Sequence, residues 1–222
     1  MGIYISDDQG SRQNRQGFES DCHTSLTKVQ GSIAPTLLKR APKSDGLVVM
    51  GSRGLDALDR FMLGSVSTKL TLHAPCFVLV VKEQPRPLCR ILLATDGSKS
   101  LEKALHFLST KLRADVCNSD GGSPLEVTIV HAMPFLKYPE PKDAGGKLVR
   151  RCAAELHKAG YVVDEVCRLG NPADEILKVA SQKTIDLIVT GAKGLGAIAR
   201  FLLGSVSTRI VQHSSCSVLV VR

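Results

Sequence analysis

Short apolar runs alternate with amphipathic stretches through the second half of the chain. The runs at 90–95 and 127–130 fit buried strands, and the stretch between them repeats leucine and alanine at helical spacing from Leu101 to Leu112. The pattern continues with a helix at about 147–159, a strand at 161–167 and a helix after Asn171. Strands that are apolar on both faces and alternate with helices are typical of a parallel sheet covered on both sides. We therefore predict a doubly wound α/β fold with a five-stranded parallel sheet.

Turn and cap residues mark the ends of these elements. Asp96-Gly97-Ser98 follows the first strand, and Ser98 is placed to cap the next helix. Gly160 stands where a helix C-cap is expected, and Asn171-Pro172 opens the last long helix with a cap and then proline. Residues 134–146 hold three prolines and two glycines, so we interpret them as a mobile loop.

The pattern also repeats between two distant parts of the chain. Residues 48–82 and 188–222 align at an offset of 140 without a gap, and 19 of the 35 positions are identical. Each copy reads as a strand, a glycine-containing loop, a helix start and a closing strand. The spacing Gly-x2-Gly-x9-Gly-Ser is formed by Gly51, Gly54, Gly64 and Ser65 in one copy and by Gly191, Gly194, Gly204 and Ser205 in the other.

The two copies belong to units of unequal size. We expect a complete unit at 88–222, a partial unit at 31–84 and a poorly structured segment at 1–30. In the partial unit, a helix at about 33–41 precedes a strand at 47–50.

Too few residues stand before the partial unit to complete a domain. Residues Ile3 to Asp7 fit a stub of the missing first strand, with Asp7 in the place of Asp96. The polar residues 9–24 are expected to be loop or disorder.

Charge and hydropathy narrow the class of protein. The formal net charge of +8 divides into +3 for residues 1–87 and +5 for residues 88–222, without a dense basic run and without tryptophan. This diffuse excess argues against a nucleic-acid partner. No apolar run approaches the ~20 residues that span a bilayer, so we expect no membrane partner.

The metal-binding residue types show no ligand spacing. The seven cysteines are scattered and odd in number, which fits reduced thiols and a cytoplasmic protein. Cys76 and Cys216 share one repeat position, where buried packing is expected. His73 and His213 stand near helix C-termini and fit compensation of the helix dipole.

The candidate chemistry lies at the carboxyl ends of the strands. In doubly wound sheets, ligands bind there, where the strand order reverses, so the Asp96 turn and the Gly191 loop should meet. Gly191 permits close approach to the backbone, and Gly204-Ser205 begins a helix whose first N–H groups suit phosphate oxygens. Lys193 adds a cation beside them.

Asp96 has two interpretations. An acidic residue on a strand-to-helix turn often closes an Asx-turn or caps the helix. In this position it is also suited to bonding ribose hydroxyls or to holding a divalent ion near the phosphates.

The Gly-x2-Gly-x9-Gly-Ser spacing, the ILLATDGS segment and the HxxC-x-VLVV ending are carried by one chain. In these three features the chain resembles the ATP-binding branch of the universal stress protein family. The resemblance implies strand order 3-2-1-4-5, dimerisation through the last strand and an adenine nucleotide as ligand. It implies that Ala94, Thr95 and Asp96 lie by the adenosine and that Val130 offers its backbone to the adenine edge. It further implies that Gly191, Gly194, Gly204, Ser205, Val206 and Ser207 line the ribose and phosphates.

Three functions remain open from the sequence. The leading one is an ATP-binding regulatory or stress-response protein, because the chain has no GxxxxGK[ST] loop for fast phosphoryl transfer. The second is a slow nucleotide hydrolase that uses Asp96 and a metal such as magnesium. The third is an interaction scaffold with a vestigial site.

Two expectations concern stoichiometry and assembly. The strand at 77–81 is expected to pair antiparallel with the strand at 217–221, within one chain or in a homodimer. One nucleotide is expected per chain, because the first unit has the phosphate loop without the strands that would contact adenine.

Overall fold

The computed structural model describes residues 4–5, 25–27, 30–52, 63–82, 88–112, 114, 124–134, 144–193 and 203–222. The first half contains β1 (Tyr4–Ile5), β2 (Ser25–Leu26), α1 (Ile33–Arg40), β3 (Ser44–Gly51), α2 (Ser65–His73) and β4 (Cys76–Val81). The second half contains β5 (Arg90–Thr95), α3 (Lys99–Lys111), β6 (Glu126–Met133), α4 (Ala144–Lys158), β7 (Val162–Leu169), α5 (Pro172–Gln182), β8 (Leu187–Gly191), α6 (Ser205–His213) and β9 (Ser217–Val221).

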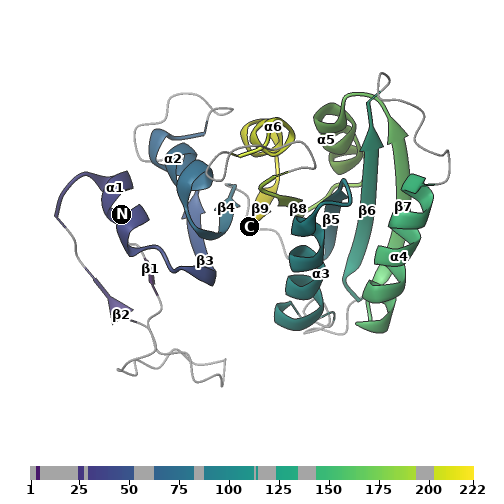
Figure 1. Cartoon of the computed structure of the whole chain (residues 1–222), viewed down its shortest axis with the longest axis horizontal. Coiled ribbons are helices and arrows are strands. Elements are labelled where there is room, and N and C mark those ends of the chain that lie inside the picture. Colours follow the sequence, from purple (N-terminus) through teal and green to yellow (C-terminus); the bar gives the residue numbers. More distant parts are fainter. Residues whose placement is uncertain are drawn as a thin grey trace.

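One seven-stranded sheet runs through both halves in the order β3-β4-β9-β8-β5-β6-β7 (Figure 1). The stretch from β7 to β9 has the predicted order 3-2-1-4-5, and all its neighbours are parallel. The α/β prediction is therefore confirmed. The five-stranded prediction described only the second half, because β4 continues the sheet beyond β9.

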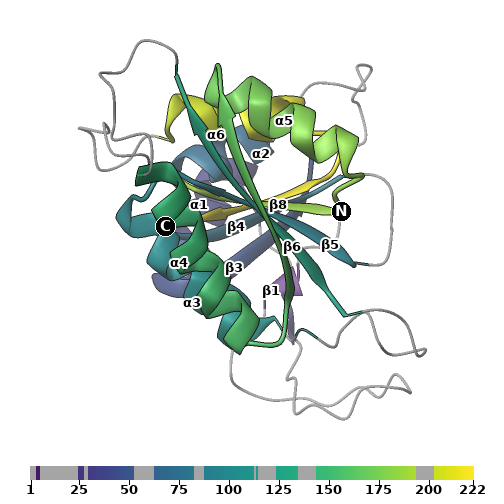
Figure 2. The ribbon, with the colours of Figure 1, turned by 90° about the vertical axis from the view of Figure 1, so that its right-hand side faces the viewer.

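Helices cover both faces of the sheet (Figure 2). The face under α3 and α4 is packed with large aliphatic residues such as Ile91, Leu108 and Leu156. The opposite face, under α1, α2, α5 and α6, buries residues such as Ile176 and Ile210. The helix that follows β5 thus lies on one face and the helix that follows β8 lies on the other, so the strand order reverses between these two neighbouring parallel strands.

Local signals explain several helix ends. Asn171 caps α5, where its side-chain oxygen accepts from the N–H groups of Ala173 (3.1 Å) and Asp174 (3.4 Å). Gly160 has a φ of +88°, the left-handed conformation expected after α4.

Tyr161, just beyond Gly160, places its hydroxyl 2.7 Å from the Leu108 carbonyl of α3. Burial raises the pKa of Tyr161 to about 12, so the phenol stays a donor at neutral pH.

One predicted helix boundary is corrected. The helix expected from 147 begins at Ala144, inside the expected loop 134–146. A Cβ on Gly145 would lie 2.7 Å from the His131 ring, so glycine lets this first turn pack against β6. The other part of that loop, 135–143, lies outside the described residues.

The amino-terminal prediction is also corrected. β1 pairs antiparallel with β2 in a separate two-stranded sheet, so Tyr4–Ile5 is not a first strand of the large sheet. The predicted loop 9–24 lies outside the described residues.

The two halves meet through a pseudo-twofold arrangement. β4 and β9 pair antiparallel about Leu79 and Leu219, which lie opposite each other. Lys82 Nζ donates to the Val211 carbonyl of α6 (3.1 Å), and Arg222 donates through Nη2 to the Thr71 carbonyl of α2. Lys82 and Arg222 are equivalent in the repeat, as are Thr71 and Val211. Each unit therefore places a cation on the last helical turn of the other, where carbonyls lack intrahelical partners.

Two further observations bear on the environment of the chain. Cys89 is disulfide-bonded, so the expectation of reduced thiols is wrong at this position. Within the part of the chain that the structure describes, no helix is both long enough and apolar enough to cross a bilayer.

The β4–β9 register predicts an intramolecular crosslink. Opposed Cα atoms of antiparallel strands lie about 4.5–5.5 Å apart, within the range that a disulfide spans. The double variant Leu79→Cys/Leu219→Cys should therefore form a disulfide within one chain, detected by mass mapping after oxidation. Each single variant is the control and should remain uncrosslinked at this site. Crosslinks found only between chains would refute the intramolecular pairing.

Candidate functional site

The loops after β5 and β8 touch at the point where the strand order reverses. The hydroxyls of Ser98 and Ser100 donate to the Lys193 carbonyl over 3.2 and 3.5 Å. A Cβ built on Gly191 would lie 2.6 Å from the Cβ of Ser100, so only glycine allows this approach. The predicted meeting of the two loops is therefore observed among the described residues.

Hydrogen bonds fix the connection from β8 to α6. The Ala192 N–H donates to the Val221 carbonyl of β9 (2.7 Å), and the Gly204 N–H donates to the Ala192 carbonyl (2.7 Å). The buried Ser207 hydroxyl donates to the Gly191 carbonyl (2.5 Å). The hydroxyl of Ser207 is thus committed to the loop, and its remaining donor toward a ligand is its backbone N–H.

The amino terminus of α6 opens onto the same loop. Gly204 is the N-cap and makes no side-chain cap bond. The Thr208 N–H donates to the Gly204 carbonyl (2.8 Å), so the N–H groups of Ser205, Val206 and Ser207 precede the helical ladder. N–H groups without an intrahelical partner, at the positive end of a helix dipole, attract anions.

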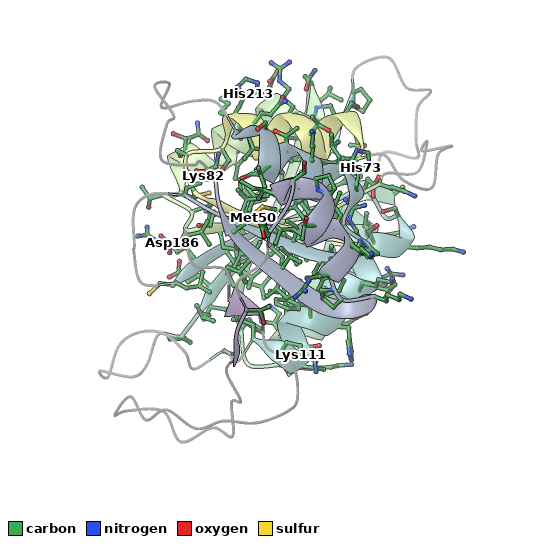
Figure 3. All side chains as sticks on the ribbon, turned by 90° about the vertical axis from the view of Figure 1, so that its left-hand side faces the viewer. Met50, His73, Lys82, Lys111, Asp186 and His213 are labelled. Atoms are coloured by element: carbon green, nitrogen blue, oxygen red, sulfur yellow. The ribbon has the colours of Figure 1, made fainter. Side chains whose placement is uncertain are left out.

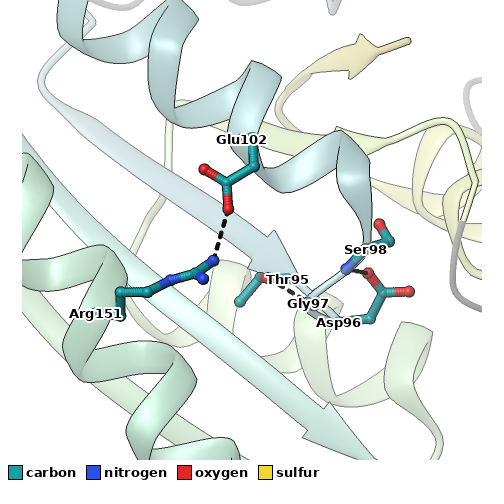
Figure 4. Close-up of polar contacts among 6 residues, drawn as sticks. All are labelled: Thr95, Asp96, Gly97, Ser98, Glu102 and Arg151. Atoms are coloured by element: carbon teal, nitrogen blue, oxygen red, sulfur yellow. Dashed lines mark hydrogen bonds and ion pairs between the residues drawn. The ribbon is translucent and has the colours of Figure 1, made fainter.

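The turn after β5 is built from its own side chains (Figure 4). Thr95 Oγ1 accepts from the Gly97 N–H (3.1 Å), and Asp96 Oδ1 accepts from the Ser98 N–H (3.0 Å). Asp96 therefore closes an Asx-turn while its side chain stays exposed at the sheet edge. Ser98 occupies the N-cap position of α3 without a cap bond, because its hydroxyl bonds Lys193.

The helix that leaves this turn is tied to its neighbour. Glu102 of α3 and Arg151 of α4 form an ion pair of 2.7 Å, drawn in Figure 4. Both side chains are more than half exposed, so the pair adds little stability to the packing of the two helices.

Val130 lies deeper than its predicted role requires. It pairs with Ala94 on β5 and Val166 on β7, and its side chain is fully buried. A strand with a neighbour on each side has its backbone groups engaged in the two ladders. This placement leaves Val130 without an open backbone group for a ligand.

Ala132 lies two residues further along β6, next to the end of β5. The Glu126 N–H donates to the Cys89 carbonyl (2.9 Å), so every second residue from Glu126 turns its backbone toward β5. The last pair with β5 joins Thr95 to His131. The ladder with β5 therefore takes up the Ala132 N–H at the Thr95 carbonyl, and only the carbonyl of Ala132 faces the space beyond the end of β5. The position of Ala132 relative to β5 depends on where β5 and β6 end. Hydrophobic periodicity in the sequence does not determine these end points.

The site residues divide into three groups. Ala94, Thr95, Asp96, Gly191, Lys193, Gly204, Ser205, Val206 and Ser207 lie at this edge, on or next to β5, β8 and α6. Val130 lies one strand away within the core. Gly194 lies outside the described residues, as does Gly54 of the first copy.

The first unit reproduces the loop without the neighbouring strand. The Ser67 hydroxyl donates to the Gly51 carbonyl (2.9 Å), and the Gly64 N–H donates to the Ser52 carbonyl (2.9 Å). These bonds match those of Ser207 and Gly204. Among the described strands, however, β3 pairs only with β4, so no counterpart of β5 stands beside this loop.

Metal-binding groups are sparse in the described part of the chain. No set of three or more histidine, cysteine or acidic side chains is close enough there to hold an ion. At the loop junction, Asp96 is the acidic residue among the candidate site residues.

Comparison with known proteins assigns the family. The sequence model described as the universal stress protein family matches residues 7–82 and 89–222. The chain belongs to the universal stress protein family. The family resemblance read from the motifs is thus confirmed across both halves of the chain.

Relatives match at moderate identity. Universal stress protein YxiE of Bacillus subtilis is 31% identical over 146 residues, which cover 60% of this chain and 98% of that protein. Universal stress protein Rv1996 of Mycobacterium tuberculosis is 30% identical over 207 residues, which cover 87% of this chain and 64% of that protein.

A solved structure supports the fold assignment. Hypothetical protein MJ0577, whose structure was used to assign its biochemical function, is 26% identical with a TM-score of 0.51. The match covers 61% of this chain and 96% of that chain.

The contact of Gly191 with Ser100 predicts a coupling between the two loops. Gly191→Ala should lower the free energy of unfolding by about 1–3 kcal/mol, because the new Cβ forces the loops apart. Ser100→Gly removes the opposing Cβ, so the double variant should lose less than the sum of the single variants. Denaturant unfolding of all four proteins measures this coupling. Strictly additive losses would show that the loops do not touch.

Proposed function

We propose that the unit at 88–222 binds ATP or a related adenine nucleotide and that the protein acts as a regulatory or stress-response module. The observation that carries the proposal is the junction of the two loops beside the uncapped start of α6. In this proposal, the N–H groups of Ser205, Val206 and Ser207 bind phosphate oxygens, and the glycines at 191 and 204 give the ligand access to the backbone.

The nucleoside half of the ligand would lie toward β5 and β6. Asp96 is exposed at the end of β5, where a carboxylate suits ribose hydroxyls. The carbonyl of Ala132 faces the space beyond β5, and in this proposal it replaces Val130 as the partner of the adenine edge. The family motif supports this arrangement, since Gly191, Gly204 and Ser205 keep its spacing.

A magnesium ion bound to the nucleotide phosphates would need few ligands from the protein. Mg²⁺ usually keeps several waters and binds through one or two carboxylates together with substrate phosphates. Asp96 is the side chain here that would serve as that carboxylate, and the ion would offset phosphate charge.

We further propose one nucleotide per chain. The partial unit at 31–84 has the loop bonds of Ser67 and Gly64 but no described strand beside β3. Loss of the adenine and ribose contacts costs affinity tenfold for each ~1.4 kcal/mol, so that loop alone would bind weakly. In this proposal, the partial unit binds no nucleotide itself, and its strand β4 pairs with β9 of the complete unit.

Glycine at position 204 provides the test of the phosphate site. Gly204→Val should abolish ATP binding measured by calorimetry, because the side chain covers the N–H groups of α6. Gly64→Val is the matched control, since it makes the same change at the equivalent position of the first unit. Circular dichroism should show both variants folded. An unchanged ATP affinity in Gly204→Val would refute the site assignment.

Stoichiometry provides a separate test. Equilibrium dialysis of the full chain at saturating ATP should give one nucleotide per chain, unaltered by Gly64→Val. A value near two that falls by half in Gly64→Val would show that the first unit also binds nucleotide and would overturn the single-site proposal.

A further inference from the structure

The outer strand of the first unit is apolar and stands at the edge of the sheet. β3 is the terminal strand of the large sheet and pairs only with β4 among the described strands. Figure 3 looks onto this end of the molecule, with Met50 of β3 near its centre. Leu47 and Val49 are 40% and 53% exposed.

In the complete unit, the residues equivalent to Leu47 and Val49 are covered by neighbouring elements. The equivalents of Leu47 and Val49 are Leu187 and Val189 on β8, which are only 7% and 0% exposed. There β5 pairs with β8, and the aliphatic cluster under α3 and α4 encloses both residues. β3 therefore keeps the apolar side chains of an interior strand while standing at the end of the sheet.

The two ends of the sheet differ in character. The other end, β7, also exposes apolar residues near its termini, Val162 and Leu169, but its middle exposes the charged Asp164, Glu165 and Arg168. Charged side chains on an edge strand oppose pairing with another chain. The centre of β3, Leu47 to Met50, carries no charge.

We propose that β3 pairs antiparallel with β3 of a second copy of this chain, which makes a twofold dimer with one sheet running through both copies. The edge is continuous with the interface between the units, since β3 lies beside β4 and β4 pairs with β9. That internal interface already joins two apolar strands antiparallel about a twofold centre. Because the pairing is isologous, it consumes both β3 edges and closes.

The sequence of β3 suits a centre at Val48. In that register Leu47 of one copy lies opposite Val49 of the other, on the same sheet face, and the reverse pair completes the symmetry. Opposed side chains on one face have Cβ atoms ~4.5–5.5 Å apart, close enough for direct contact. The last strand, β9, is already engaged by β4, and of the two terminal strands β3 is the one without charge at its centre.

Mass measurement of the full chain tests the proposal. Light scattering after gel filtration should give twice the 23.8 kDa monomer mass at high protein concentration. Val49→Lys should weaken dimerisation at least tenfold, because a charge would stand against Leu47 of the other copy. Val162→Lys on β7 is the matched control, since Val162 is 51% exposed, and it should leave the dimer intact. Circular dichroism of both variants checks that they fold.

A mixing experiment tests the register. Leu47→Cys and Val49→Cys proteins should crosslink to each other on oxidation more than either does alone. A protein that stays monomeric at every concentration overturns the proposal. In that case the edge of β3 would be covered by another segment of the chain or by a different protein. A dimer that survives Val49→Lys, or that Val162→Lys disrupts instead, overturns it as well.

Discussion

The antiparallel contact between β4 and β9 is the interaction on which the arrangement of the whole chain depends. Val78, Val80, Val218 and Val220 are fully buried, although each strand would be a sheet edge if its unit stood alone. β3 and β4 without β9 would form a two-stranded parallel pair, which is marginal in water. The first unit is therefore stabilised by the second, and the reciprocal bonds from Lys82 and Arg222 join the end of each closing strand to the last helix of the other unit.

Much of this organisation follows from the sequence because the signals are local. Helical spacing, the Asn171 cap and the apolar runs predict the elements in order, and the offset repeat predicts that β4 and β9 are equivalent. The carboxyl-end rule then brings Asp96 and Gly191 together without knowledge of any distance. What escapes prediction depends on partners far along the chain. Ser98 is a sound cap by sequence, yet its hydroxyl bonds the carbonyl of Lys193, which comes 95 residues later.

The adenine contact shows the same limit in another form. Whether Val130 or Ala132 turns an open backbone group toward a ligand depends on where β5 stops relative to β6. That end point is set by the turn at Asp96, whose side chain bonds the Ser98 N–H, and the apolar pattern of β6 is the same on either side of it. A shift of two residues keeps a side chain on the same face, so periodicity cannot separate the two candidates.

The repeated glycine motif has a structural role that is separable from ligand binding. In both units a serine in the first turn of the helix donates to the carbonyl of the glycine that ends the strand, from Ser67 to Gly51 and from Ser207 to Gly191. These bonds hold the strand–loop–helix connection whether or not a nucleotide is present. The motif alone therefore indicates a connection of this shape. A binding site requires the second loop as well, and within the described chain only the complete unit brings serines from a neighbouring helix against it.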